Sequence, residues 1–470
     1  MARRASNPVV VLVCLAITVS MALVVLWQWA DAQTLVAAEP TIAATADPTV
    51  ALATPVLSVR RAPTVLSREV NVTQFAVDLQ PLLDQVGTTS CVAVSVDGRH
   101  VASKNGTLPV LPASTSKLLV AASALEVLGP SYTFRTGAYG TVEDGVVAGD
   151  LVLLGGGDPV LTTQAWITNG FQKYPPINVT RLEALADALV TAGITRVDGR
   201  VLGDGSRYDD EFFNPTWADG IKVTEAGPYD ALLVDDGRVG GVPTSDPALG
   251  AAQVFTRLLR DRSITVGQGA AVGTGDLTNE IAGIDSAPLG DILREMLETS
   301  DDNTAEMLVK ELGVANGTGG TTAAGLAIVT EQLGRWGVPL NGVVMVDGSG
   351  LSRENSVTCD ALLAVLEHGS LDDAVGQGLP VAAVSGTLQD EFVSTAMAGV
   401  LRAKTGSLTD VKALAGYVPV AGGSVIEFAL VLDQPGANDP GVYRAVWEGA
   451  LAQVFASYPS GASADELAPR

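Results

Sequence analysis

The stretch Pro112-Ala113-Ser114-Thr115-Ser116-Lys117 runs directly into the apolar segment Leu118-Leu119-Val120-Ala121-Ala122. This pattern predicts a helix that begins near Ser114. Residues three positions apart share one helical face, with Cβ atoms about 5–6 Å apart. The Lys117 amine can therefore reach the Ser114 hydroxyl and take its proton, and the unpaired N–H groups of the helix start lie near the same oxygen. The spacing predicts a nucleophilic serine that is activated by a lysine.

A mechanism based on histidine has little support in the sequence. The chain contains two histidines, His100 and His368, and neither has neighbours that suggest a catalytic triad. Serine is also a preferred helix N-cap, so a capping role for Ser114 is the alternative. For Lys117 the alternative is an exposed surface position, which the apolar residues that follow it disfavour.

The length and charge of the chain limit the classes of protein to which it can belong. At 470 residues it is long enough for two or three domains. Its 52 Asp and Glu residues outnumber its 28 Lys and Arg residues. This balance argues against nucleic-acid binding, which needs clustered basic side chains. No Cys or His spacing resembles a zinc site, so we expect neither a metal ion nor a cofactor.

The three cysteines are Cys14, Cys91 and Cys359. Cys14 lies in the apolar N-terminal segment, so at most Cys91 and Cys359 could pair with each other. We expect both to be buried free thiols, since cysteine behaves as a small hydrophobic residue. A disulfide between them is the alternative.

The N-terminus predicts export from the cytoplasm. Arg3 and Arg4 precede the uncharged run 8–27, which is long enough to cross a bilayer of about 30 Å. We favour an uncleaved membrane anchor over residues 1–32, and the alternative is a signal peptide cleaved near Ala30-Asp31-Ala32. Both place the rest of the chain outside the cytoplasm, because the arginines stay inside. Residues 33–70 are rich in Ala, Thr and Pro, which predicts a disordered linker.

Hydrophobic periodicity predicts strands at both ends of the folded region and helices between them. We expect strands at 91–96, 100–104, 400–408, 411–418 and 424–433, and helices at 77–86, 114–128, 289–299, 305–312, 321–336, 358–368 and 442–458. Between 132 and 277 the sequence pattern instead predicts short strands and turns, with strands at 150–154 and 196–202 and a helix at 181–192. The arrangement favours a mixed α/β (α+β) domain that is interrupted by an inserted smaller domain.

The loop Gly155-Gly156-Gly157-Asp158-Pro159 is rich in glycine, as phosphate-binding loops are. It lacks the Gly-Lys-Ser/Thr ending and the apolar helix that follow such loops. We therefore interpret it as a turn.

Two further segments support the prediction of a catalytic serine. Lys404-Thr405-Gly406-Ser407 lies inside a predicted strand, where glycine lets a ligand approach the backbone closely. Ser300-Asp301-Asp302-Asn303 lies between two predicted helices. With Ser114-x-x-Lys117, these segments have the order of the motifs Ser-x-x-Lys, Ser-x-Asn and Lys-Thr-Gly of the penicilloyl-serine transferases.

The chain resembles the low-molecular-mass class C penicillin-binding proteins, the D-alanyl-D-alanine carboxypeptidase/endopeptidase family. The likeness covers roughly residues 75 to 460 and includes segments beyond the three motifs: Gly149-Asp150-Leu151, Gly155 to Pro159, Asp347-Gly348-Ser349-Gly350-Leu351-Ser352 with Asn355 and Thr358, and Ser385-Gly386-Thr387-Leu388. The resemblance implies an antiparallel sheet flanked by helices, as in penicillin-binding proteins and serine β-lactamases. The penicillin-binding domain would comprise residues 71–131 and 278–465, and the inserted domain residues 132–277.

The resemblance also implies the roles of the site residues. Ser114 would attack the carbonyl of the penultimate D-alanine of a peptidoglycan stem peptide, and Lys117 would take its proton. Ser300 would relay a proton to the leaving D-alanine. The substrate-binding residues would be Lys404, Thr405, Gly406 and Ser407: Lys404 and Thr405 would bind the terminal carboxylate, and the N–H groups of Ser114 and Ser407 would form the oxyanion hole. β-Lactams would acylate the same serine.

The chain departs from the family pattern in the second motif. Family members usually carry asparagine where this chain has Asp302, and Asn303 follows next. Either the loop shifts so that Asn303 enters the site, or a carboxylate replaces the amide. A carboxylate near Lys117 would favour the charged ammonium and weaken it as a base. The alternatives to a peptidase are a peptidoglycan-binding or sensor protein that has lost turnover, and a β-lactamase.

Overall fold

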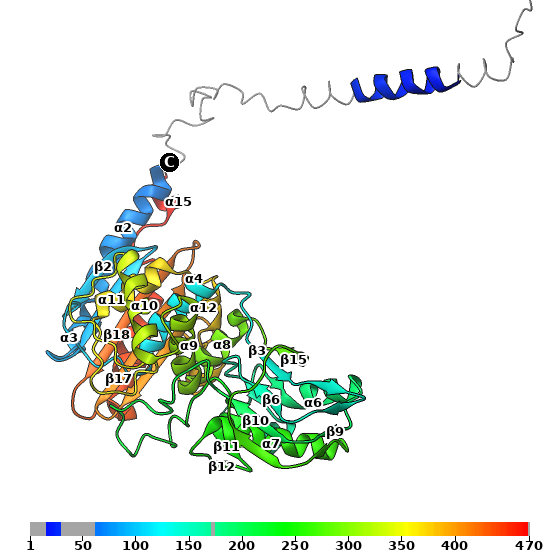
Figure 1. Cartoon of the computed structure of the whole chain (residues 1–470). Coiled ribbons are helices and arrows are strands. Elements are labelled where there is room, and N and C mark those ends of the chain that lie inside the picture. Colours follow the sequence, from blue (N-terminus) through cyan, green and yellow to red (C-terminus); the bar gives the residue numbers. More distant parts are fainter. Residues whose placement is uncertain (1–15, 30–61, 171–173, 469–470) are drawn as a thin grey trace, which may run out of the picture. The chain divides into compact units, whose positions relative to one another are not determined.

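The computed structural model describes residues 16–29, 62–170 and 174–468 (Figure 1). The chain divides into two compact units, residues 1–68 with 463–470 and residues 69–462. Residues 16–29 form an exposed helix. Among the described residues, no helix is both long enough and apolar enough to span a bilayer. The predicted anchor run 8–27 begins outside the described residues.

The first helices differ from the prediction at two points. Helix α2 spans Ala62–Asp78, so the part of the predicted linker between 62 and 70 is helical. Helix α3 follows at Gln80–Gln85. The predicted helix 77–86 therefore belongs to two helices, and the second begins with Pro81 in its first turn, where proline is favoured. The predicted linker residues before Ala62 lie outside the described part of the chain.

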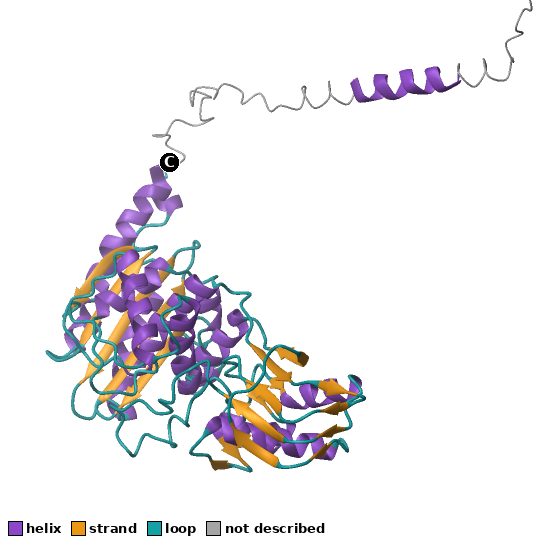
Figure 2. Ribbon diagram, viewed as in Figure 1, coloured by secondary structure: helices purple, strands orange, loops and turns teal. Residues whose placement is uncertain are grey.

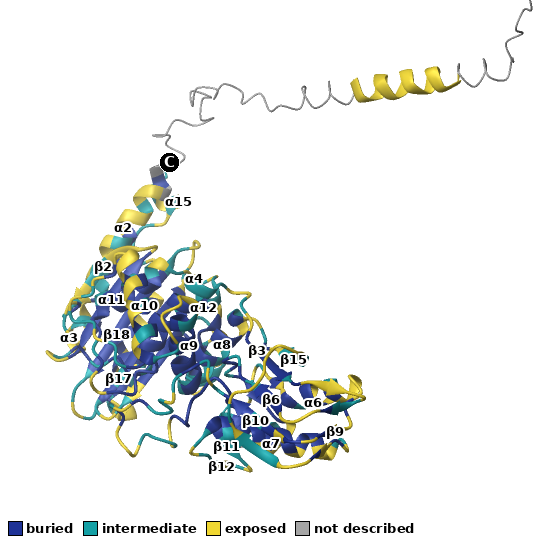
Figure 3. Cartoon of the chain, in the orientation of Figure 1, coloured by how far each residue is buried: buried dark blue, intermediate teal, exposed yellow. Residues whose placement is uncertain are grey.

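The main sheet has five antiparallel strands in the order β16-β17-β18-β1-β2. Figure 2 shows its strands in orange with helices packed around them. The strands are β1 Cys91–Val96, β2 Arg99–Lys104, β16 Arg402–Leu408, β17 Val411–Pro419 and β18 Val425–Asp433. All five predicted strands are confirmed. Alternate residues of β18 face different cores: Phe428 and Leu430 face one, and Ala429 and Val431 face the other. The sheet is thus buried on both faces, as the period of two in a strand allows (Figure 3).

Helices cover both faces of the main sheet. One layer comprises α4 Ser116–Leu128, α8 Leu289–Thr299, α9 Asp302–Ala315, α10 Thr322–Arg335, α11 Cys359–His368 and α12 Ala374–Gly378. The other face packs against α3 and the C-terminal helical segment, which is α13 Pro440–Arg444, a π-helical stretch Ala445–Leu451 and α14 Ala452–Ser457. These positions confirm the predicted helices. A short helix, α15, spans Ala464–Leu467.

A second sheet has its own hydrophobic core, built from residues between Ala138 and Ile284. Its strand order is β14-β10-β6-β3-β15, with both parallel and antiparallel pairs. The strands are β3 Arg135–Tyr139, β6 Leu151–Leu154, β10 Arg200–Asp204, β14 Gly269–Val272 and β15 Glu280–Asp285, and helices α6 Leu182–Thr191 and α7 Pro247–Asp261 pack on them. A smaller sheet contains β13 Thr265–Val266, β9 Arg196–Val197, β5 Val146–Val147 and β4 Val142–Glu143.

Four predictions for this region can be compared with the structure. The strand predicted at 150–154 and the helix predicted at 181–192 are confirmed as β6 and α6. The strand predicted at 196–202 is two strands, β9 and β10, which belong to different sheets. The glycine-rich segment is irregular backbone that ends in a turn at Pro159-Val160, and its glycines are needed for close packing. A Cβ on Gly155 would lie 2.3 Å from the carbonyl oxygen of Ala231, and one on Gly156 would lie 2.0 Å from that of Arg135.

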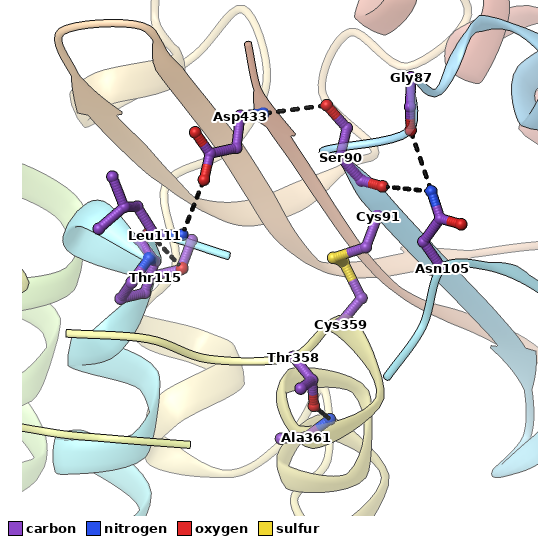
Figure 4. Close-up of a disulfide and its surroundings, with 11 residues drawn as sticks. Gly87, Ser90, Cys91, Asn105, Leu111, Thr115, Thr358, Cys359, Ala361 and Asp433 are labelled. Atoms are coloured by element: carbon purple, nitrogen blue, oxygen red, sulfur yellow. Dashed lines mark hydrogen bonds between the residues drawn. A yellow bond between two sulfur atoms is a disulfide. The ribbon is translucent and has the colours of Figure 1, made fainter. Parts of the chain in front are cut away.

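Cys91 and Cys359 form a disulfide (Figure 4), so the expectation of two free thiols was wrong. Cys91 is the first residue of β1 and Cys359 is the first residue of α11, and both are fully buried. Their Cα atoms are 5.9 Å apart, within the usual range for a disulfide. The pairing depends on α11 beginning beside β1, and two cysteines 268 positions apart carry no local sign of that contact.

Candidate active site

The predicted nucleophile lies in a tight turn. Residues Ala113–Thr115 form a short 3-10 helix that leads into α4, and Ala113 has a left-handed backbone with φ of 46°. Gly350 packs against this turn, since a Cβ there would lie 1.9 Å from the Ala113 carbonyl oxygen. Strained backbone of this kind persists where the surrounding structure holds it, and it is common at active sites. The turn places Ser114 at the wall of a groove.

Lys117 is fully buried and contacts three oxygen atoms. Its Nζ lies 3.0 Å from Ser114 Oγ, 2.6 Å from Asp302 Oδ1 and 2.8 Å from the Ser349 carbonyl oxygen. The predicted contact between the amine and the serine hydroxyl is therefore present. The Asp302 side chain is 12% exposed, so the ion pair is almost completely shielded from water.

The Ser349 carbonyl is held by a buried scaffold that the sequence did not reveal. Glu306, on α9, accepts hydrogen bonds from the N–H groups of Gly348 and Ser349. Asp347 accepts from the N–H groups of Gly350 and Ser352. Burial, and then the negative charge of Asp347, raise the pKa of the Glu306 carboxyl. A glutamate in a buried helical stretch was the one signal that could have identified this support.

The second motif lies between two helices. Ser300 ends α8 with a left-handed backbone, and Asp301 caps the start of α9 by accepting a hydrogen bond from the Thr304 N–H. Asp302, the first residue of α9, points to Lys117. The Asn303 amide instead donates to Asp236 Oδ1, at 3.4 Å. Of the two alternatives, the structure therefore shows the carboxylate in place of the amide.

The third motif lies on β16. Lys404 is fully buried, and its Nζ donates to Ser300 Oγ at 2.8 Å and to the Thr405 carbonyl at 2.9 Å. Burial, and then the positive charge of Lys117, lower the pKa of Lys404 well below its usual range. The Thr405 hydroxyl bonds to the Thr387 hydroxyl at 2.8 Å. Ser114, Lys117, Asp302, Ser300 and Lys404 thus form one site.

The other two residues of this motif lie beside the nucleophile turn and the groove. A Cβ on Gly406 would lie 2.9 Å from the Pro112 carbonyl oxygen, so glycine lets β16 pack directly against the turn. Ser407 lines the groove, and its hydroxyl accepts a hydrogen bond from Lys412 Nζ at 2.9 Å.

A groove of about 710 Å³ opens over these residues. Its lining includes Ser114, Ser300, Asn303, Thr405 and Ser407, from the segments around the main sheet. Further lining residues come from segments 159–166, 174–179 and 221–238, which lie in the chain between strands of the second sheet. Four acidic residues of the lining were not predicted as site residues: Glu225, Asp236, Glu295 and Asp301. Within the described ranges, no cluster of three or more His, Cys, Asp or Glu side chains is placed to hold a metal ion.

Comparison with known proteins gives a consistent result. The D-Ala-D-Ala carboxypeptidase 3 (S13) family matches residues 70–242 and 241–454. Carboxypeptidase DacB of Mycolicibacterium smegmatis is 34% identical over 385 residues, covering 78% of this chain and 79% of that protein. A D-alanyl-D-alanine carboxypeptidase of Actinomadura sp. (strain R39) is 29% identical over 445 residues, covering 74% of this chain and 79% of the relative.

The fold has a solved counterpart. The crystal structure of penicillin binding protein 4 from Haemophilus influenzae superposes with a TM-score of 0.68 and 22% identity, covering 81% of this chain and 98% of that one. Sequence and fold together show that the chain belongs to the D-Ala-D-Ala carboxypeptidase 3 (S13) family of serine peptidases, with the fold of a penicillin-binding protein.

Proposed function

We propose that the chain cleaves peptidoglycan stem peptides after the carbonyl of a D-alanine, as a serine-type D-Ala-D-Ala carboxypeptidase, a DD-endopeptidase or both. The observation that carries this proposal is the 3.0 Å contact between Lys117 Nζ and Ser114 Oγ at the wall of a groove. The match to the S13 family supports the same reaction.

The contacts of Lys117 suit a general base. A neutral amine has two N–H donors and one lone pair. The Asp302 carboxylate and the Ser349 carbonyl can accept the two N–H groups, which leaves the lone pair for the Ser114 proton. Ser114 Oγ then bonds to the carbonyl carbon of the penultimate D-alanine while its proton passes to Lys117.

Collapse of the tetrahedral intermediate breaks the peptide C–N bond. Ser300, bonded to Lys404, relays the proton that Lys117 took from Ser114 to the leaving D-alanine nitrogen, which restores the neutral Lys117 amine. Lys404 and Thr405 bind the terminal carboxylate, and the N–H groups of Ser114 and Ser407 stabilise the oxyanion. Water, deprotonated by Lys117, then attacks the acyl-enzyme, which releases the shortened peptide and restores the Ser114 hydroxyl.

A β-lactam follows the first half of this pathway. Attack by Ser114 on the lactam carbonyl opens the ring, but the amine stays attached to the acyl group and cannot leave. We propose that the product is a long-lived adduct on Ser114.

We further propose where the enzyme acts and how its chain is divided. Residues 1–32 act as a membrane anchor or signal segment, and residues from 33 begin a linker to an extracytoplasmic enzyme at the cell wall. We place the end of the inserted domain at residue 285 instead of the expected 277, because strand β15 (280–285) pairs with β3 of the second sheet. Residues 132–285 then form the inserted domain, and residues 71–131 and 286–465 form the peptidase domain.

The test is labelling of the full chain with a fluorescent penicillin. We expect a covalent adduct on the wild type and none on Ser114→Ala. Ser116→Ala is the matched control, because it removes a second hydroxyl from the same segment and should still label. An adduct that survives Ser114→Ala, or no adduct on the wild type, would refute the proposal.

Product analysis separates the two peptidase activities and the alternatives. Mass spectrometry of two reactions separates these activities. A carboxypeptidase releases D-alanine from a monomeric pentapeptide, and an endopeptidase cleaves a cross-linked tetrapeptide dimer into its two peptides. Binding of stem peptide without any release would identify a sensor protein. Rapid turnover of penicillin would identify a β-lactamase.

A further inference from the structure

Two lysines and one aspartate occupy the centre of the site. Lys117 Nζ lies 2.6 Å from Asp302 Oδ1, and Lys404 reaches the same centre through Ser300. Lys117 and Lys404 are both fully buried. Charges in such surroundings interact more strongly than they do in water. The Asp302 carboxylate therefore has a strong influence on the charged forms of both amines.

The charged groups that face this centre come from five elements. Helix α4 provides Lys117, the start of α9 provides Asp302, and Asp301 precedes it. Strand β16 provides Lys404, and Lys412 on β17 adds a positive charge near it. Glu306 and Asp347 lie behind the Ser349 carbonyl and bond to the backbone of that loop.

Asparagine and aspartate would differ here in charge and hardly at all in geometry. Either side chain can accept a hydrogen bond from Lys117 through Oδ1, and they have nearly the same shape. Burial raises the pKa of Asp302 to about 6, with Lys117 acting in the opposite direction, so above that pH the carboxylate is charged. A charged Asp302 stabilises the ammonium form of Lys117, whereas the reaction needs the neutral amine.

We propose that Asp302 is a positioning residue that moves the working range of this enzyme to higher pH, because its carboxylate lies 2.6 Å from the Lys117 amine and favours the charged form of that amine over the neutral form that the reaction needs. The proposal rests on the acylation of Ser114 described above. An opposite charge at this distance shifts a titration by about 1–3 pH units. The acid limb of acylation should therefore lie about 1–3 pH units higher with aspartate than with asparagine.

The test measures the rate of acylation by a fluorescent penicillin between about pH 6.5 and 10, with the full chain. We expect Asp302→Asn to move the midpoint of the acid limb down by about 1–3 pH units, and Asp302→Glu to keep it near that of the wild type. Asp360→Asn is the matched control, because Asp360 also lies in the first turn of a helix, α11, and does not line the groove.

The outcomes are distinct. A labelled wild type whose profile coincides with that of Asp302→Asn would overturn the role of Asp302 and leave the peptidase proposal intact. A wild type that is not labelled at any pH would overturn the peptidase proposal itself. Should Asp302→Asn fail to fold, Asp302→Ser removes the same charge with a smaller side chain, and the same shift is required of it.

Discussion

The disulfide allows a quantitative prediction. Cys91→Ala combined with Cys359→Ala removes a cross-link that closes a loop between residues 268 positions apart. A chain-entropy model gives about 5–6 kcal/mol for a loop of that length, and removal of native disulfides is measured to cost about 2–5 kcal/mol. Because both side chains are fully buried and alanine leaves only a small void, we expect a loss of about 2–5 kcal/mol in the free energy of unfolding.

The assay is unfolding of the full chain in guanidinium chloride, followed by tryptophan fluorescence. The wild type after reduction should lose about as much stability as the double variant. Cys14→Ala is the control: it removes the remaining cysteine, which lies outside the closed loop, and should leave the transition unchanged.

Counting thiols tests the pairing itself. The chain has three cysteines, so the unreduced full chain, once unfolded, should expose one reactive thiol. Three reactive thiols would show that the disulfide is absent. One thiol together with an unchanged unfolding transition in the double variant would show that the loop-closure reasoning is wrong.

Three further predictions concern the backbone at Gly350, the ion pair of Glu311 and the effect of pH through Asp230. Gly350→Ala should reduce penicillin acylation about a hundredfold, because its Cβ would collide with the Ala113 carbonyl beside the nucleophile. Gly129→Ala, also at positive φ but with open space around it, should cost about 1–3 kcal/mol of stability and keep its labelling. Glu311→Ala should lower the free energy of unfolding, measured in denaturant, by about 3–5 kcal/mol, since this buried carboxylate is paired with Arg207. Glu311→Gln keeps a hydrogen-bond acceptor and should lower it by less. Burial raises the pKa of Asp230 to about 7, so its contribution to stability is complete below the unfolded pKa of about 4 and is lost as the pH rises to 7. Thermal unfolding of Asp230→Asn should therefore depend less on pH between about 4 and 7, and a dependence equal to that of the wild type would contradict the assignment.

The sequence predicted best what depends on neighbouring residues. The five strands of the main sheet follow from short apolar or alternating stretches that end at turn residues such as Asp97-Gly98. Four of these strands contact a core on both faces, and β2 packs Val101 and Ala102 against one core. Ser114 and Lys117 lie three positions apart, so one helical turn brings their side chains together. The order of the motifs then placed Ser300 and Lys404 in the same site, where they share a hydrogen bond.

What the sequence could not predict depends on contacts between distant segments or on single backbone angles. The choice between Asp302 and Asn303 follows from the left-handed backbone at Ser300, with φ of 66°, which sets the direction in which α9 begins. The carbonyl that supports Lys117 belongs to Ser349, 232 positions away. Neither feature has a periodic signature, so only the folded chain reveals them.

The position of β1 in the main sheet determines when the enzyme can form. Cys91 pairs with Val431 in the ladder between β1 and β18, so these neighbours are 431 − 91 = 340 positions apart. The ribosome therefore delivers the serine long before it delivers the strands that complete the sheet around it. Contacts of such long range slow folding, since the chain between them must first be ordered. Acylation by penicillin would then appear only once synthesis is almost finished. A nascent chain that stops before residue 400 would contain Ser114 but could not form the active site.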